Sequence, residues 1–85
     1  MKLIISSRFH KDLAKLASKN TKLKKQISKT LELLLDSPTY PSLRLHKLSN
    51  HGDYSVSVNM SIRIIFRQYG ANIFLLRIGS HEEVY

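Results

Sequence analysis

Two prolines divide this chain into halves of different periodicity. Before the segment 36–42 (DSPTYPS), apolar residues recur every three or four positions, as on one face of a helix. After it, apolar and polar residues alternate, and turn residues recur in SNHGD, NMS and QYGAN, which is typical of short strands. Proline lacks an N–H donor and disfavours helical backbone in the residue before it, so neither pattern can cross this segment. A helical half followed by a strand half predicts an α+β fold.

The first half predicts one short strand and two helices. Residues 3–6 (LIIS) are apolar and β-branched, which favours a strand. Ser7 can then cap a helix, and Thr21, after the break at Asn20, can cap a second one that must end before Pro38. Because the break between the helices is short, we expect an antiparallel two-helix hairpin.

The second half predicts four strands with short connections, which favours an antiparallel meander. The expected strands are residues 43–48, 54–58, 62–68 and 72–79. With the first strand they form a small, mainly antiparallel sheet, and the helical hairpin is expected on one of its faces. A chain of 85 residues has room for one modest core, so residues 1–85 are predicted to form a single domain.

The charge of the chain favours an anionic partner. Fourteen Lys and Arg against six Asp and Glu give a formal net charge of +8, which favours a polyanion or an acidic protein. The chain has no cysteine and its four histidines lack compact ligand spacing, so no metal and no cofactor are expected. No segment has the pattern of a signal peptide or a bilayer span. We therefore expect a cytoplasmic protein without membrane contact.

Side chains alternate between the two faces of a strand, so parity sorts the second half into a core face and a polar face. The core parity contains Leu43, Leu45, Tyr54, Val56, Val58, Ile62, Ile64, Phe66, Phe74, Leu76 and Ile78. The polar parity contains Arg44, His46, Ser55, Ser57, Arg63, Arg67, Arg77 and, if the extended path continues past Gly79, His81. Leu48, Ile65, Ile73 and Leu75 also have the polar parity, so the separation is imperfect. No carboxylate is expected there, because Asp53, Glu82 and Glu83 are expected in turns or in the tail.

A sheet face with charges of one sign favours contact with phosphodiester. The alternative is an ordinary solvated face, since antiparallel sheets normally have one polar side and arginine is common there. A merely soluble face, however, usually mixes both signs. We therefore expect an RNA or DNA backbone to bind this face. The expected contacts are Arg44, Lys47, Ser55, Ser57, Arg67 and Arg77.

Four residues are candidates for chemistry. His81 follows a strand end, and an imidazole is a natural general acid or base near neutral pH, although an exposed histidine is often only a polar filler. Arg63 lies in mid-strand, where its neighbours can fix it for a phosphate. His46 either lines the same cleft or binds backbone at a sheet edge. Tyr85 either packs on the sheet, stacks on a base or donates a proton.

These segments, in this order, resemble the RelE/ParE superfamily of bacterial type II toxin–antitoxin toxins, and most of all the RelE/YafQ-like mRNA interferases. The resemblance covers the whole chain and rests on the basic helical hairpin and on LRLHKL, YSVSV, SIRIIFR and IGSHEEVY. It implies a RelE-like fold and a ribosome-dependent, metal-independent endoribonuclease that cleaves translated mRNA. The 2′-hydroxyl of the message attacks the adjacent phosphate in that family. An acidic or amphipathic antitoxin is implied as the inhibitor.

The resemblance also implies roles for the four candidates. Arg63 matches the arginine that holds the scissile phosphate, and His81 matches the C-terminal acid/base position. His46 matches a histidine of YafQ-like members. Tyr85 matches a terminal aromatic residue that is catalytic in some relatives and stacks on a base in others.

Two departures from the family pattern leave alternatives open. Ser55 and Ser57 stand where some RelE members carry two catalytic lysines, and the stretch 57–61 lacks the further histidine or aspartate of YafQ-like members. The alternatives are a ParE-like inhibitor of DNA gyrase and an inactive homologue that binds RNA or antitoxin. Arg63 together with His46 and His81 favours the nuclease, because a gyrase inhibitor has no need of imidazoles on a cationic face.

Overall fold

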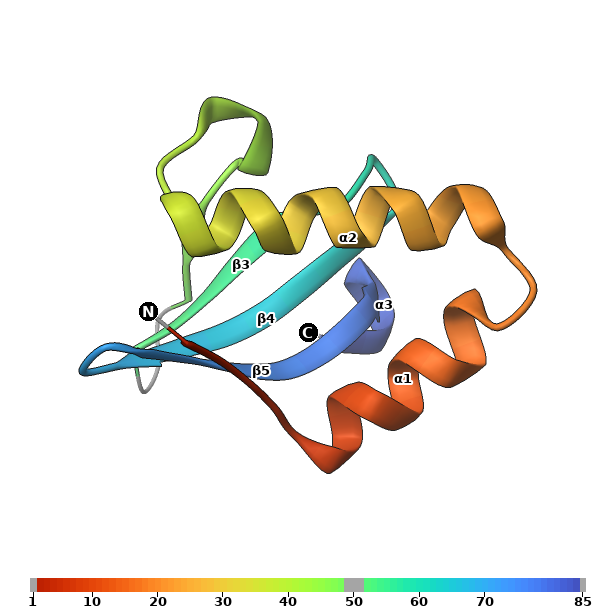
Figure 1. Ribbon diagram of the computed structural model, residues 1–85, viewed down its shortest axis with the longest axis horizontal. Helices are drawn as coiled ribbons and strands as arrows, with labels where there is room; N and C mark the ends of the chain where they lie inside the picture. Colours follow the sequence, from red (N-terminus) through yellow and green to blue (C-terminus); the bar gives the residue numbers. More distant parts are fainter. Residues whose placement is uncertain (1, 49–51, 85) are drawn as a thin grey trace.

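The described part of the chain, residues 2–48 and 52–84 of a computed structural model, folds into two layers (Figure 1). One layer is a five-stranded sheet of order β1-β5-β4-β3-β2. In the other, α1 and α2 share one apolar core with the sheet. In chain order the elements are β1 (Lys2–Ile5), α1 (Ser7–Ala17), α2 (Thr21–Asp36), the 3-10 turn η1 (Pro41–Leu43), β2 (His46–Lys47), β3 (Asp53–Ser57), β4 (Ile62–Tyr69), β5 (Asn72–Ser80) and α3 (His81–Val84). The predicted α+β fold is confirmed: β1 pairs parallel to β5, and all other neighbours are antiparallel.

Both helix caps lie one position before the predicted ones. Ser6 Oγ accepts the N–H of Phe9 at 3.0 Å, and Asn20 Oδ1 accepts the N–H of Leu23 at 3.0 Å. The predictions of Ser7 and Thr21 were wrong because an N-cap residue keeps extended backbone. The extended residues here are the preceding ones, Ser6 and Asn20. The expected end of the second helix before Pro38 is confirmed.

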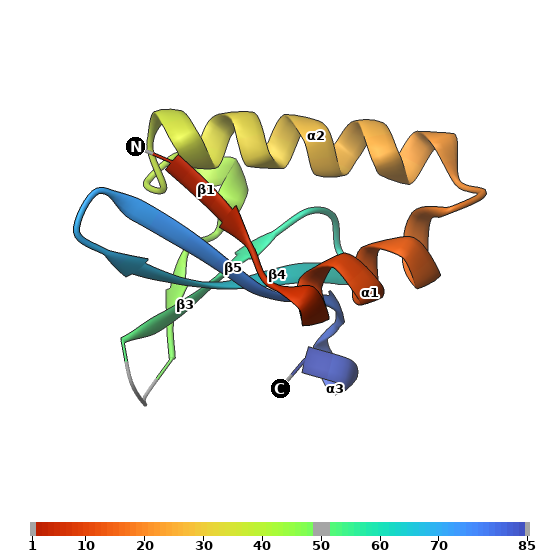
Figure 2. The same ribbon diagram turned by 60° about the horizontal axis from the view of Figure 1, so that its bottom comes forward.

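The two helices run in opposite directions but splay apart. They meet at the short connection of residues 18–20 and diverge from it (Figures 1 and 2). A hollow of about 380 Å³ between them is lined mainly by apolar side chains of both helices, among them Leu13, Ala14, Ile27 and Leu31. The hairpin is therefore less closely packed than its short connection suggested. None of the described helices combines the length and apolar character needed to cross a bilayer.

A β-bulge changes which side chains of β5 face the core. Opposite β4, the register runs through Ile65 and Arg77 and then shifts, so that Phe66 pairs with Leu75 and Leu76 is the extra residue. Ile73 and Leu75, which have the polar parity, are consequently buried in the core, whereas Phe74 and Leu76, expected in the core, are only half-buried. Parity predicts faces correctly only up to such an insertion.

The strand expected at residues 43–48 is mostly absent. The segment 41–43 forms η1, so a 3-10 turn that begins at Pro41 takes the place of the first residue of the expected strand. Arg44 then takes left-handed backbone with φ 48. Of residues 43–48, His46 and Lys47 pair with β3, and the N–H of Leu48 donates to the Asp53 carbonyl at 2.8 Å. Leu43 is buried as expected, but Leu45, also expected in the core, is exposed. The extended path continues past Gly79 by one residue, since β5 ends at Ser80 and α3 begins at His81, so the condition for His81 to take the polar parity of the strand is not met.

Candidate functional site

Arg63 is the second residue of β4, the central strand of the sheet, and donates hydrogen bonds to two neighbouring segments. Its Nη1 donates to Ser57 Oγ at 2.8 Å, and its Nε and Nη2 donate to Ser55 Oγ at 3.2 and 2.8 Å. Ser57 lies directly opposite Arg63 on β3. The backbone carbonyl of Arg44 accepts a further bond from Nη2 at 3.1 Å. These three oxygens hold the guanidinium in one orientation.

The carbonyl of Arg44 is aimed by a turn. Arg44 follows η1 and donates its N–H to the carbonyl of Pro41 at 3.1 Å. Its φ of 48 lies in the left-handed region, which is uncommon for residues other than glycine. The turn therefore directs a backbone oxygen toward Arg63 while the next residues run on into β2.

Three of the four candidates for chemistry converge on one open hollow. The hollow measures about 360 Å³ and is lined by Arg44, Leu45, His46, Arg63 and His81. A second hollow of about 260 Å³ shares Arg44 and Arg63 with it and extends to Ser42, Ser57, Val58, Asn59 and Met60. The fourth candidate, Tyr85, lies outside the described residues. An oriented guanidinium beside two imidazoles can bind a phosphate and move protons.

Ser55 and Ser57, expected as RNA contacts, also have a role that their sequence does not reveal. Both hydroxyls accept hydrogen bonds from Arg63, and Ser55 is fully buried. Asn59, in the stretch that lacks the family's histidine or aspartate, binds its own turn through the N–H of Ile62 and binds Gln26 of α2. Within the described ranges, no three His, Asp or Glu side chains form a group that could hold a metal ion.

Two of the expected RNA-binding arginines are paired with carboxylates. Arg67 Nε lies 2.6 Å from Asp53 Oδ1, and the two residues are opposite each other on β4 and β3. Arg77 Nε lies 2.8 Å from Asp12 Oδ2 on α1. The expectation that no carboxylate reaches these arginines is therefore wrong: Asp53 begins a strand instead of lying in a turn, and Asp12 comes from the helical half.

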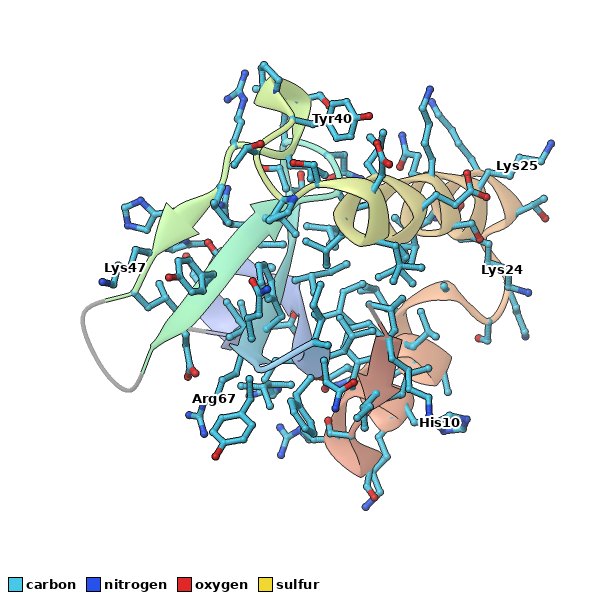
Figure 3. All side chains as sticks on the ribbon, turned by 60° about the vertical axis from the view of Figure 1, so that its left-hand side comes forward. His10, Lys24, Lys25, Tyr40, Lys47 and Arg67 are labelled. Atoms are coloured by element: carbon cyan, nitrogen blue, oxygen red, sulfur yellow. The ribbon has the colours of Figure 1, made fainter. Side chains whose placement is uncertain are left out.

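Lys47, the remaining expected RNA contact, does not line either hollow that contains Arg63. It follows His46 on β2 and therefore points to the opposite face of that strand. Figure 3 shows Lys47 and Arg67 projecting from the sheet in different directions. The candidate site thus consists of the hollow around Arg63, and Lys47 and Arg67 are peripheral to it.

Asp12 joins α1 to the edge of β5, and the residue-type pattern of the sequence did not single it out. Its Oδ2 accepts both Arg77 Nε at 2.8 Å and the backbone N–H of Ile78 at 3.2 Å. Burial by itself raises the pKa of Asp12, but the hydrogen bonds from Arg77 and Ile78 and the charge of Arg77 outweigh it, so the pKa lies below its ordinary value. The carboxylate therefore holds the part of β5 that continues beyond β1.

Asp12→Asn should lower the free energy of unfolding by about 1–3 kcal/mol at pH 7, because hydrogen bonds to a charged group are lost. Since the folded-state pKa of Asp12 is depressed, its carboxylate stabilises the fold above the unfolded-state pKa, and this stabilisation is lost as the pH falls through the folded-state pKa. Urea unfolding of both proteins at neutral pH and near pH 3 measures this. The exposed Glu32→Gln is the control, and a difference between wild type and Asp12→Asn that is the same at both pH values would contradict the expectation.

The chain as a whole, residues 1–85, matches the family model of YafQ, a bacterial toxin of type II toxin–antitoxin systems. A metal-bound toxin from Helicobacter pylori has the same fold, with a TM-score of 0.85 and 23% identity over 100% of this chain and 99% of that chain. YafQ in the DinJ–YafQ complex from E. coli has a TM-score of 0.82 and 24% identity, over 98% of this chain and 96% of that chain. A YoeB/ParE toxin from Agrobacterium tumefaciens has a TM-score of 0.83 and 15% identity, over 95% of this chain and 99% of that chain. No curated protein sequence matches this chain.

Proposed function

Because this chain belongs to the YafQ family of bacterial type II toxins, we propose that it is a ribosome-dependent endoribonuclease that cleaves translated mRNA. The observation that carries the proposal is the hollow in which His46, Arg63 and His81 meet. Two imidazoles supply proton transfer, and the oriented guanidinium supplies a cation for phosphate oxygens. RNA brings its own nucleophile, the 2′-hydroxyl, so the protein needs only to position the RNA, transfer protons and stabilise the transition state.

In the proposed reaction the 2′-hydroxyl attacks the adjacent phosphorus and the bond from phosphorus to the 5′-oxygen breaks. The products are a 2′,3′-cyclic phosphate and a 5′-hydroxyl. One of His46 and His81 accepts the proton of the 2′-hydroxyl, and the other protonates the departing 5′-oxygen. Arg63 binds the non-bridging oxygens, on which negative charge builds up in the transition state. The step requires no metal ion.

The surroundings of Arg63 supply the proposed contacts to the rest of the RNA. Arg44 contributes a second cation to both hollows, and Leu45 places an exposed apolar side chain in the first. Arg67 and Arg77 share their charge with Asp53 and Asp12, so we assign them a weaker part in binding phosphate. Ser55 and Ser57 act through Arg63.

We also propose that an acidic, amphipathic antitoxin inhibits this protein. The E. coli relative is known in a DinJ–YafQ complex. Here the net charge of +8 favours an acidic partner. The apolar hollow between α1 and α2 is bordered by Lys24, which Figure 3 shows on α2 beside that gap. An amphipathic helix with carboxylates beside its apolar stripe fits this surface.

The test of the function is cleavage in a purified translation system, read by primer extension. We expect cuts within the coding sequence of an mRNA under translation, and no cuts in the same mRNA without ribosomes. A gyrase supercoiling assay with the same protein tests the main alternative. Inhibition of gyrase without any RNA cleavage would overturn the proposal in favour of a ParE-like activity. The absence of both effects would favour an inactive binding homologue.

A further inference from the structure

A reciprocal pair of hydrogen bonds begins α3. Ser80 Oγ accepts the backbone N–H of Glu83 at 3.3 Å, and the Glu83 carboxylate accepts the backbone N–H of Ser80 at 3.1 Å. This arrangement is a capping box, in which each residue satisfies an N–H group that the start of a helix leaves without an internal partner. The pattern S-x-x-E is visible in the sequence SHEE.

The helical turn depends on this cap because it is short. α3 has only four residues. Helices of that length do not form on their own in water, because fixing the backbone of the first turn costs more free energy than its hydrogen bond contributes. Its conformation therefore comes from the capping box and from packing against the sheet.

Gly79 allows the capped turn to fold back onto the sheet. A Cβ at Gly79 would lie 3.2 Å from Val84 Cγ1, closer than side chains normally approach, and would be in van der Waals contact with Glu83. Gly79 pairs with Arg63 across β5 and β4. Figure 2 shows α3 on the side of the sheet away from α2. The cap therefore holds the turn against the strand position beside Arg63.

His81 is the first residue of this turn and lines the hollow with His46 and Arg63. The backbone conformation that the capping box selects sets the direction of the Cα–Cβ bond of His81, and with it the direction in which the imidazole leaves the turn. A displacement of a catalytic group by about 1 Å can cost on the order of 100-fold in rate. A cap that orders His81 is therefore expected to affect the reaction rate more than the stability of the whole fold.

The cap is intact near neutral pH. Hydrogen bonds from the Ser80 backbone and then from the Ser80 side chain lower the pKa of Glu83, and the charge of Lys15 on α1 lowers it further, while desolvation and Asp12 oppose them. Because the folded-state pKa is depressed, the carboxylate's contribution is present above the unfolded-state pKa and is lost only in acid.

We propose that Ser80 and Glu83 are positioning residues that hold the imidazole of His81 for proton transfer to or from RNA. The inference rests on the proposed endoribonuclease activity, but it concerns residues that act through His81 and not on the RNA itself.

The experiment compares ribosome-dependent cleavage by wild type, Glu83→Ala and Glu83→Gln, with Glu82→Ala as the matched control. Glu83→Ala should lower kcat by about 10- to 100-fold with little change in KM, because the imidazole loses its position while the phosphate contacts remain. Glu83→Gln should stay within about threefold of wild type, since a glutamine oxygen accepts the same bond in a capping box. Glu82→Ala removes the same charge from the same turn without touching the cap and should leave kcat unchanged.

A second readout separates this inference from the proposed function. Cα chemical shifts of residues 81–84, measured by NMR without RNA, should be helical in wild type, Glu83→Gln and Glu82→Ala and should lose that character in Glu83→Ala. If wild type cleaves no RNA, the proposed function fails and these shifts alone decide whether the cap orders the turn. Wild-type shifts and rates in Glu83→Ala would overturn the inference. A rate for Glu83→Gln as low as that for Glu83→Ala would also overturn it, because charge would then matter instead of the cap.

Discussion

His81→Ala should lower the rate of mRNA cleavage by about 100- to 10,000-fold, which is the usual contribution of a general acid or base. His81 lines the hollow that also contains Arg63 and His46, so its loss removes one of the two imidazoles from the proposed proton transfers. The stability of the fold should change little, since His81 is exposed.

Primer extension on mRNA translated in a purified system measures this effect, with single-turnover rates at saturating ribosome. His10→Ala is the matched control, because His10 is also an exposed histidine but lies on α1 (Figure 3). Cuts that disappear with His81→Ala and persist with His10→Ala would place His81 in the mechanism. Equal cleavage by wild type and His81→Ala would keep the nuclease and remove His81 from its chemistry.

Arg63→Ala should lower kcat by at least about 100-fold, because an oriented donor to the developing charge of the transition state is lost. Arg63→Lys should recover only a small part of this rate. A lysine ammonium lacks the planar fork that Ser55, Ser57 and the Arg44 carbonyl hold in one orientation. The loss should therefore appear in kcat more than in KM.

The control for this prediction is Arg8→Ala, which removes an arginine of α1 whose side chain is 64% exposed. Circular dichroism of each variant establishes that it is folded before its rate is compared. A wild-type rate for Arg63→Ala at saturating ribosome would refute the assigned role. A loss confined to KM would reduce Arg63 to a residue that binds RNA without stabilising the transition state.

Much of the fold follows from local patterns. The change of periodicity at Pro38 and Pro41 separates the helices from most of the strands, and the alternation in SIRIIFR places Ile64 and Phe66 in the core with Arg63 on the other face. Errors arise where a single residue changes the register. The extra residue Leu76 reverses the faces of the part of β5 that precedes it, and the left-handed turn at Arg44 replaces most of a predicted strand.

The partners of charged and hydroxyl side chains could not be predicted in the same way. Asp12 and Arg77 are 65 positions apart in the chain and meet only because α1 packs beside β5. Serines at alternate positions, such as Ser55 and Ser57, are typical of an ordinary solvated strand face, yet both accept hydrogen bonds from Arg63. The capping box of Ser80 and Glu83 is different, since its spacing is local and could have been found in the sequence.

The sequence by itself determined the class of fold, the net charge and the residue types available for chemistry, because periodicity and composition act over a few neighbouring positions. It also carried the family resemblance, since the order of the segments is a property of the chain. Only the tertiary structure decided which charges are neutralised and which side chains meet in one hollow. His46, Arg63 and His81 come from three different elements, and their convergence depends on strand register and turn geometry. Strand parity indicated a shared polar face for Arg63 and His46, but register and turn geometry are set by packing across the whole fold, which no local pattern contains.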